Sequence, residues 1–276
     1  MTSIIITFYE RLSHLKNCLD ALALCSKDFD EVVITDDGSK EATIGDLKKM
    51  IACYTFPITF VTQPKQGFRK AAALNNGIRH SRGDYLIFLD CDFLVLPDTI
   101  QAHLNKAKTG RFVAGACKYL NEEQSRTILK SNWSTDLIEK YYRDLPDKEI
   151  IVQHRRFIKR SILIKLHLAS PRKQSLGGHL SIYKKDIEYI NGYDENFIGW
   201  GGEDEDLGIR LAAAGIYCIS AIRYARVLHI WHPSELRSSI NGPWKQGTMR
   251  DYFHQNKIAF VCENGLKKID VIINPG

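Results

Sequence analysis

Residues 85–92 read Tyr-Leu-Ile-Phe-Leu-Asp-Cys-Asp, an apolar run that stops abruptly at two carboxylates with a cysteine between them. Short apolar runs of this length are typical of a strand buried on both faces. If the strand continues past Leu89, Asp90 and Asp92 point to one face and Cys91 turns into the core. Two converging carboxylates repel each other unless a cation or proton lies between them, and their oxygens suit Mg²⁺ or Mn²⁺. The stretch therefore predicts a divalent-cation site, with a turn cap and a solvated acid as the simpler alternative.

Short apolar segments alternate with amphipathic segments of helical length through the first half of the chain. We predict strands at Ser3–Phe8, Glu31–Thr35, Ile58–Thr62, Tyr85–Leu89 and Arg111–Ala116, and helices at Leu12–Leu24, Lys40–Cys53, Lys70–Ser81 and Asp98–Lys108. This alternation is typical of a mainly parallel sheet covered by helices, a Rossmann-like α/β unit. Such sheets bind ligands beyond the carboxyl ends of their strands. The polar loops at those ends are Thr7–Arg11, Asp36–Lys40, Gln63–Lys70 and Asp90–Leu94.

The composition is typical of a globular protein. The 276 residues, 44% of them hydrophobic, can bury a large core, and the net charge of +6 suits an anionic ligand, a membrane surface or nucleic acid without choosing among them. The seven cysteines form no Cys-x-x-Cys pair, which indicates free thiols in a reducing compartment. The sequence predicts neither a signal peptide nor a membrane-spanning run. We therefore expect a cytoplasmic protein, with peripheral contact at the inner face of a membrane as a variant of that prediction.

The periodicity is lost from about residue 120 to 173, where basic residues gather in 154–160. We interpret this stretch as a helical insert in a single domain, in which residues 1–118 form a ligand-binding half, residues 119–235 a second half and residues 236–276 a tail. Charge runs are usually solvated faces and few aromatic residues lie among these cations, so nucleic acid is not expected as a partner. An anionic lipid surface or an acidic glycan suits the cations better.

Residues 200–206, Trp-Gly-Gly-Glu-Asp-Glu-Asp, place four acids at the predicted start of a helix. Acids in a first turn complement the helix dipole, which accounts for one or two of them. The glycines before them let a substrate approach the backbone, and Trp200 offers a flat apolar face for a sugar ring. We expect the carboxylates of Glu203 and Asp204 to stay ionised near neutral pH, so that either can accept a proton from an attacking hydroxyl.

Several ordered motifs together resemble the nucleotide-sugar glycosyltransferases of family-2 type, which have the GT-A fold, with a C-terminal half similar to the galactosyltransferases and chondroitin polymerases. The matching tracts are Ile4–Tyr9, Val33–Ser39, Gly67–Gly77, Gly83–Asp92, Gly192–Glu195 continuing to Arg210-Leu211, and His229–Pro233. They cover most of the chain outside residues 120–172. The resemblance implies a three-layer α/β sandwich with a mainly parallel central sheet. It also implies a metal-dependent transfer of a hexose or N-acetylhexosamine from a UDP-sugar to a glycan or lipid-linked acceptor.

The resemblance further implies roles for individual residues. The donor-binding residues would be Thr7, Tyr9 and Asp37 at the nucleoside, Arg69 at the diphosphate, Asp90 at the ribose or the metal, and Asn75, Cys91 and Trp200. Asp92 would bind Mn²⁺ or Mg²⁺ directly together with a histidine, for which His229 matches the family position better than His232. Asp204, with Glu203 beside it, would be the catalytic base. Retaining relatives usually carry Asp-x-His where this chain has Asp-Cys-Asp, so the resemblance favours inversion.

Two other classes of function fit parts of the sequence. A carbohydrate- or nucleotide-binding module without catalysis would use Trp200 for stacking and would release no nucleoside diphosphate. A sugar-phosphate nucleotidyltransferase would need a glycine- and arginine-rich loop after the first strand, where this chain has Thr7–Arg11. The donor sugar stays open among galactose, glucose and their N-acetylamino forms.

Overall fold

A seven-stranded sheet forms the centre of the computed structural model, which describes residues 1–276 apart from 131, 172–178, 200, 234–258 and 269–276. Its strands are β1 (Thr2–Phe8), β2 (Glu31–Asp36), β3 (Ile58–Thr62), β4 (Tyr85–Asp90), β6 (Arg111–Ala114), β8 (Leu180–Tyr183) and β9 (Tyr217–Ser220), in the order β3-β2-β1-β4-β8-β6-β9. The pairs β1–β2, β1–β4, β2–β3 and β6–β9 are parallel, and β8 is antiparallel to both of its neighbours. The sheet is therefore mainly parallel, as the sequence predicts.

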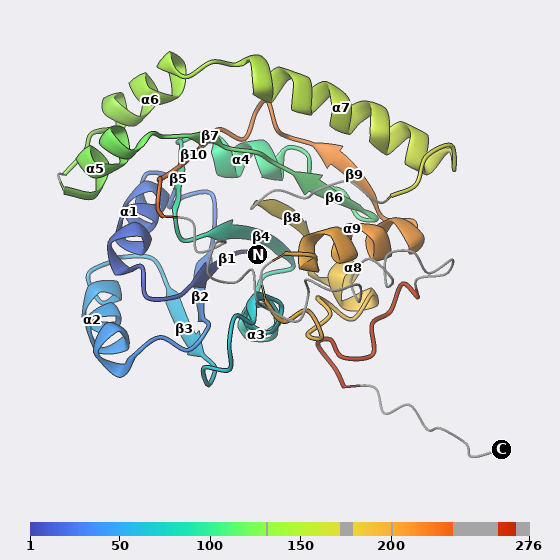
Figure 1. Ribbon diagram of the computed structural model, residues 1–276, viewed down its shortest axis with the longest axis horizontal. Helices are drawn as coiled ribbons and strands as arrows, with labels where there is room; N and C mark the ends of the chain where they lie inside the picture. Colours follow the sequence, from blue (N-terminus) through green and yellow to red (C-terminus); the bar gives the residue numbers. More distant parts are fainter. Residues whose placement is uncertain (131, 172–178, 200, 234–258, 269–276) are drawn as a thin grey trace.

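Helices cover both faces of this sheet (Figure 1). They are α1 (Leu12–Ala23), α2 (Glu41–Ile51), α3 (Lys70–His80), α4 (Thr99–Leu104), α5 (Glu122–Lys130), α6 (Thr135–Asp144), α7 (Lys148–Lys165), α8 (Lys184–Tyr189) and α9 (Glu203–Ala213). Ile4 and Ile6 of β1 belong to one buried cluster with Leu19 of α1, while Ile5 belongs to another with Leu74 of α3. Successive side chains of a strand point to opposite faces, so the two clusters lie on opposite sides of the sheet. The predicted three-layer α/β sandwich is confirmed.

A second sheet connects the two halves of the chain. Its strands are β5 (Phe93–Val95), β7 (Lys118–Tyr119) and β10 (Val227–His229), in the order β5-β10-β7. The antiparallel pairing of β10 with β5 sets His229 opposite Phe93, and the backbone N–H of Ile230 donates to the carbonyl of Asp92 at 2.9 Å. A late segment of the chain is thereby fixed beside the turn that follows β4.

The predicted elements of the first half are all present, with ends that differ by at most four residues. The helical character predicted for residues 120–173 is also confirmed, because α5, α6 and α7 occupy most of this stretch. At the end of β6, Gly115 approaches His179 so closely that an added Cβ would lie 1.7 Å from the imidazole, and the strand stops at Ala114 rather than Ala116. Strands β5, β7, β8, β9 and β10 are missing from the prediction because runs of two to four residues are too short to show periodicity.

Candidate active site

Three potential metal ligands meet beside the turn that follows β4. The Oδ2 atom of Asp92 lies 3.1 Å from Nε2 of His232 and 3.7 Å from Nε2 of His229, and ligand atoms of the three residues fall within 4.8 Å of one another. The sequence left these histidines as alternatives, whereas the structure brings both to one carboxylate. Because β4 ends at Asp90, strand alternation does not build this cluster as expected. The pairing of β10 with β5 does so instead.

The electrostatics of this cluster suit a cation. Burial alone would raise the pKa of Asp92, but the hydrogen bond to His232 and the nearby His229 and Arg11 hold that pKa below its ordinary value. Burial lowers the pKa of His229, which keeps its imidazole neutral and able to bind a metal. Within the described ranges, Asp92 Oδ1 and His229 Nδ1 are buried without a hydrogen-bond partner. Buried polar atoms normally have one, so these residues fit a divalent ion.

Asp90 is held by other partners. Its Oδ1 accepts a hydrogen bond from Thr7 Oγ1 at 2.8 Å and lies 2.9 Å from Nζ of Lys70, the first residue of α3. The Asp92 cluster as the structure describes it does not include Asp90. Burial would lower the pKa of Lys70, but Asp90, Asp204 and Glu203 hold it well above its ordinary value. Lys70 is therefore a fixed cation among carboxylates.

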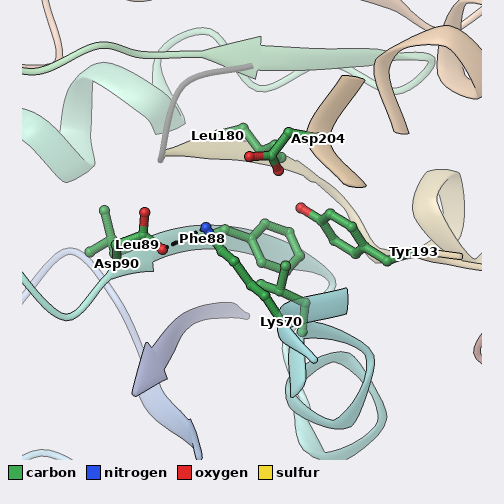
Figure 2. Close-up of a pocket in the computed structure, with 8 residues that line it drawn as sticks. Lys70, Phe88, Leu89, Asp90, Leu180, Tyr193 and Asp204 are labelled. Carbon is green, nitrogen blue, oxygen red and sulfur yellow. Dashed lines mark ion pairs between the residues drawn. The ribbon is translucent and has the colours of Figure 1, made fainter. Parts of the chain in front are cut away.

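Lys70 projects into a pocket between the two halves of the chain (Figure 2). The pocket is lined by Lys70, Leu74, Phe88, Leu89, Asp90, Leu180, Tyr193 and Asp204. Figure 2 shows the Lys70–Asp90 pair on one side, Asp204 on the opposite side, and the hydroxyl of Tyr193 turned toward the space between them. A ligand in this pocket would meet a cation on one side and a carboxyl group on the other.

The carboxyl group of Asp204 departs from the expectation that it stays ionised near neutral pH. Burial raises its pKa to about 7, with Lys70 opposing the rise and Glu203 and Asp90 adding to it. Desolvation thus outweighs the helix dipole. A pKa near 7 is well matched to proton transfer at neutral pH. Glu203 is also buried, and its Oε2 has no hydrogen-bond partner in the described part of the chain.

The loops after β1, β2 and β3 gather the residues that the resemblance assigns to the nucleoside. The Asp37 carboxylate accepts hydrogen bonds from Gln63 Nε2 at 2.7 Å and from the backbone N–H of Arg69 at 3.0 Å. Lys65 Nζ lies 3.5 Å from the same carboxylate and 3.4 Å from the centroid of the Tyr9 ring. The structure therefore brings Tyr9, Asp37 and Arg69 together at the carboxyl edge of the sheet, while Thr7 faces Asp90.

The resemblance assigns contact with the diphosphate to Arg69 alone, whereas the structure places the neighbouring Lys70 in the pocket. The Arg69 guanidinium donates to Gln66 Oε1 at 2.6 Å and is not among the groups that line the pocket. The next residue, Lys70, reaches the pocket and pairs with Asp90. Sequence reasoning overlooked Lys70. The available signal was a lysine at the first position of a helix whose N-terminus faces the ligand-binding edge of the sheet.

Asn75 and Cys91, for which the resemblance implies donor contacts, both have buried side chains. The buried Asn75 amide donates to the carbonyl of Tyr193 at 2.8 Å, and its oxygen accepts the Tyr193 N–H at 2.9 Å. Gly192, with φ of +74°, allows this approach because an added Cβ would lie 2.5 Å from Asn75 Oδ1. Cys91 is buried in the same apolar cluster as Leu89, as strand alternation predicts. The donor contacts that the resemblance implies for both residues stay predictions.

Replacing Asn75 with alanine should lower the free energy of unfolding by about 1–3 kcal/mol, because the buried N–H of Tyr193 loses its acceptor. Urea denaturation followed by tryptophan fluorescence measures the change. Gln101→Ala is the control, since its hydrogen bond to Asn105 is exposed and should contribute within about 0.5 kcal/mol. Equal stability of the two variants would contradict a structural role for Asn75.

Trp200 lies outside the described residues, so the sugar-stacking role expected of it stays a prediction. The glycines that follow it are described. Gly201 and Gly202 have φ of +90° and +95°, in the region that favours glycine, and Gly202 is the N-cap of α9. The backbone before Asp204 therefore requires these glycines for its own conformation, whatever binds there.

The chain is similar to known proteins in sequence. The family model described as Glycosyl transferase family 2 matches residues 3–166, and that described as N-terminal domain of galactosyltransferase matches residues 160–233. A Validoxylamine A glucosyltransferase of Streptomyces hygroscopicus subsp. jinggangensis is 31% identical over 242 residues, which are 78% of this chain and 52% of that protein. The Chondroitin synthase of Escherichia coli is 26% identical over 272 residues, which are 92% of this chain and 39% of that protein. The chain thus spans about half the length of these relatives, or less.

It is also similar in structure. The crystal structure of GalNAc-T7 with UDP, GalNAc and Mn²⁺ matches with a TM-score of 0.58 at 15% identity, over 91% of this chain and 47% of that one. Likeness at this level of identity is a likeness of fold. The fold is the GT-A fold that the resemblance implies.

Proposed function

The chain belongs to Glycosyl transferase family 2, and on that premise we propose that it moves a hexose or N-acetylhexosamine from a UDP-sugar to a hydroxyl of a glycan or lipid-linked saccharide. Such a transfer would be a step in surface polysaccharide or glycoconjugate synthesis. The observation that carries the proposal is the pocket in which the Lys70–Asp90 pair faces Asp204 (Figure 2). The donor site would lie in the half formed by residues 1–118, and the acceptor site in the half formed by residues 119–235.

A divalent ion, Mn²⁺ or Mg²⁺, is the cofactor that this proposal includes. Asp92, His229 and His232 would hold it, since their ligand atoms converge and two buried polar atoms of the cluster have no partner within the described residues. Imidazole nitrogens beside a carboxylate favour Mn²⁺ over Mg²⁺, which prefers oxygen ligands. When bound, such an ion stabilises the negative charge that develops on the departing diphosphate.

Direct displacement would use both sides of the pocket. The acceptor oxygen attacks the anomeric carbon, the bond from that carbon to the diphosphate breaks, and Asp204 takes the acceptor proton. Lys70, held 2.9 Å from Asp90, would face the diphosphate and stabilise it as it leaves. Because Asp204 lies on the side opposite Lys70 (Figure 2), attack from that side would invert the anomeric configuration. Proton NMR of the first product formed would report that configuration.

Release of UDP tests the proposed function. The protein would be incubated with UDP-glucose, UDP-galactose and their N-acetylamino forms, with Mn²⁺ and with or without oligosaccharide acceptors. We expect release that depends on the acceptor, that is confined to one or two donors and that EDTA abolishes. Binding of a UDP-sugar without release under all these conditions would instead favour a carbohydrate- or nucleotide-binding module.

Replacing Lys70 with glutamine should shift the pH dependence of kcat/KM to higher pH. A base acts in its deprotonated form, so kcat/KM falls as the pH drops through the Asp204 pKa of about 7. Lys70 lowers that pKa, so its removal raises the pKa. The acid limb of the pH profile, in which kcat/KM falls with falling pH, therefore shifts to higher pH. Loss of a cation facing the diphosphate should also reduce kcat roughly 10²-fold.

The matched control for this shift is Lys65→Gln. It removes a cation that lies at Asp37 and Tyr9 instead of in the pocket. This control should keep the acid limb of the wild type, because Lys65 does not contribute to the pKa of Asp204. An acid limb that stays in place in the Lys70 variant would contradict the assignment of that limb to Asp204.

A further inference from the structure

The outer face of α7 carries a concentration of exposed aliphatic side chains. This helix lies along the outermost edge of the molecule (Figure 1). Val152, Ile158, Ile162, Leu166 and Leu168, in the helix and the turn after it, are 44–71% exposed. They are five of the twelve large hydrophobic residues exposed in the described part of the chain. Contiguous exposed apolar surface of this kind marks a contact site more often than scattered single residues do.

The inner face of α7 is firmly attached, so its outer face has a fixed orientation. Ser161 Oγ donates to the carbonyl of Cys218, and His154 Nδ1 lies 2.8 Å from Ser220 Oγ, which joins the helix to β9 at both points. Ile150 and Ile164 are buried on the same side. The exposed aliphatic groups therefore belong to a well-anchored helix, and they cannot turn inward without breaking these contacts.

Cations accompany the aliphatic groups along the outer face. Ile158, Ile162 and Leu166 follow one another at four-residue spacing, and so do Arg155 and Lys159, all of them exposed. Residues four apart are neighbours on a helix surface, so an aliphatic ridge and a cationic ridge run side by side. No acidic residue occurs in the sequence between Glu149 and Asp186. Nothing on this stretch of chain neutralises the positive face.

We propose that α7 docks on the surface of an anionic lipid bilayer. Helices with aliphatic groups beside lysine and arginine bind there, with the aliphatic groups in the headgroup region and the cations at lipid phosphates. A glycan is a poorer ligand for this face, because it would not contact the aliphatic ridge. A protein partner is also a poorer fit, because the core of a protein interface is usually depleted in lysine. Long cationic side chains, in contrast, extend along apolar groups to reach phosphates.

The purpose of this contact rests on the proposed function, because a lipid-linked acceptor would be reached from a bilayer surface. Within the described ranges, no helix is both long and apolar enough to cross a bilayer.

Sedimentation with lipid vesicles tests the proposal on the full chain. We expect binding to vesicles of phosphatidylcholine mixed with phosphatidylglycerol, little binding to phosphatidylcholine alone, and weakening by salt. Each cation at such a surface contributes about fivefold to binding, so Arg155→Gln/Lys159→Gln should weaken it about 25-fold. Ile162→Ser/Leu166→Ser should weaken it at least about tenfold without any change in charge. The control Lys48→Gln/Lys49→Gln removes the same charge from exposed positions of α2 and should bind as the wild type does.

Several outcomes would contradict the proposal that α7 docks on an anionic bilayer. One is undiminished vesicle binding by either α7 variant. Another is a wild type that ignores anionic vesicles but forms a dimer that Ile162→Ser/Leu166→Ser disrupts, because the occupant would then be a second copy of the chain. Assays of UDP release with a water-soluble acceptor keep the two proposals separate. The α7 variants should match the wild type there, and absence of release from every form would count against the proposed function alone.

Discussion

The Asp204→Asn variant should release UDP about 10²–10⁴ times more slowly than the wild type, while it binds the UDP-sugar with nearly unchanged affinity. Asparagine keeps the size and shape of the side chain but cannot take up the acceptor proton. The effect should fall on kcat because proton transfer belongs to the transition state and not to the binding of the donor. Steady-state kinetics of UDP release and calorimetric titration with the donor measure the two quantities separately.

Neighbouring acids of α9 provide the controls for Asp204. Glu205→Gln removes a carboxylate from the same turn that does not line the pocket, so its kcat should remain close to that of the wild type. Glu203→Gln tests the other acid predicted for catalysis, which is buried but also absent from the pocket lining. Wild-type turnover in Asp204→Asn together with a large loss in Glu203→Gln would transfer the role of base to Glu203.

The sequence predicts those parts of the fold that depend on local patterns. β4 can be predicted because Tyr85–Leu89 is an apolar run of the length of a buried strand. α1 can be predicted because its apolar residues recur at helical spacing. β8 and β10 have four and three residues and gain their stability from partners far away in the sequence. No window of the sequence contains those partners, so neither β8 in the central sheet nor β10 in the second sheet could be predicted.

The candidate site likewise has residues that local sequence predicts and residues that long-range contacts bring together. Asp92 is identifiable from the end of an apolar run, but strand alternation does not position its side chain, because the strand ends before Asp92. The contribution of both histidines follows from the pairing of β10 with β5, which is a long-range contact. Lys70 is a candidate site residue because it lines the same pocket as Asp204. The two residues belong to different halves of the chain, so only the folded structure shows that they lie close together.

The protonation state of Asp204 shows why electrostatics was harder to predict than position. A carboxylate at a helix N-terminus is stabilised by a few tenths of a kcal/mol to about 1 kcal/mol at an exposed site. Burial in the pocket acts in the opposite direction and is the larger effect, since the pKa rises to about 7. Helix position can be inferred from sequence, whereas burial depends on the packing of α9 against the rest of the chain.

Replacing Asp92 with asparagine should abolish Mn²⁺ binding at concentrations that saturate the wild type and lower UDP release roughly 10³-fold. An amide lacks the negative charge that would attract the ion to this cluster, and stabilisation of the departing diphosphate by a metal would contribute several kcal/mol. Electron paramagnetic resonance of free Mn²⁺ measures the affinity without reference to activity. His229→Ala and His232→Ala should each weaken Mn²⁺ binding, because both imidazoles face the same carboxylate.

Asp90→Asn separates the metal cluster from the neighbouring ion pair. Asp90 lies 2.9 Å from Lys70 and outside the described Asp92 cluster, so its replacement should slow UDP release while Mn²⁺ affinity stays within about threefold of the wild type. If Asp90→Asn loses Mn²⁺ as completely as Asp92→Asn, the ion is held by both carboxylates, as the sequence Asp90-Cys91-Asp92 alone predicts. If one histidine variant keeps full affinity, the metal has a single imidazole ligand. Together the four variants identify the ligands from metal affinity alone, because none of these outcomes depends on which sugar the enzyme transfers.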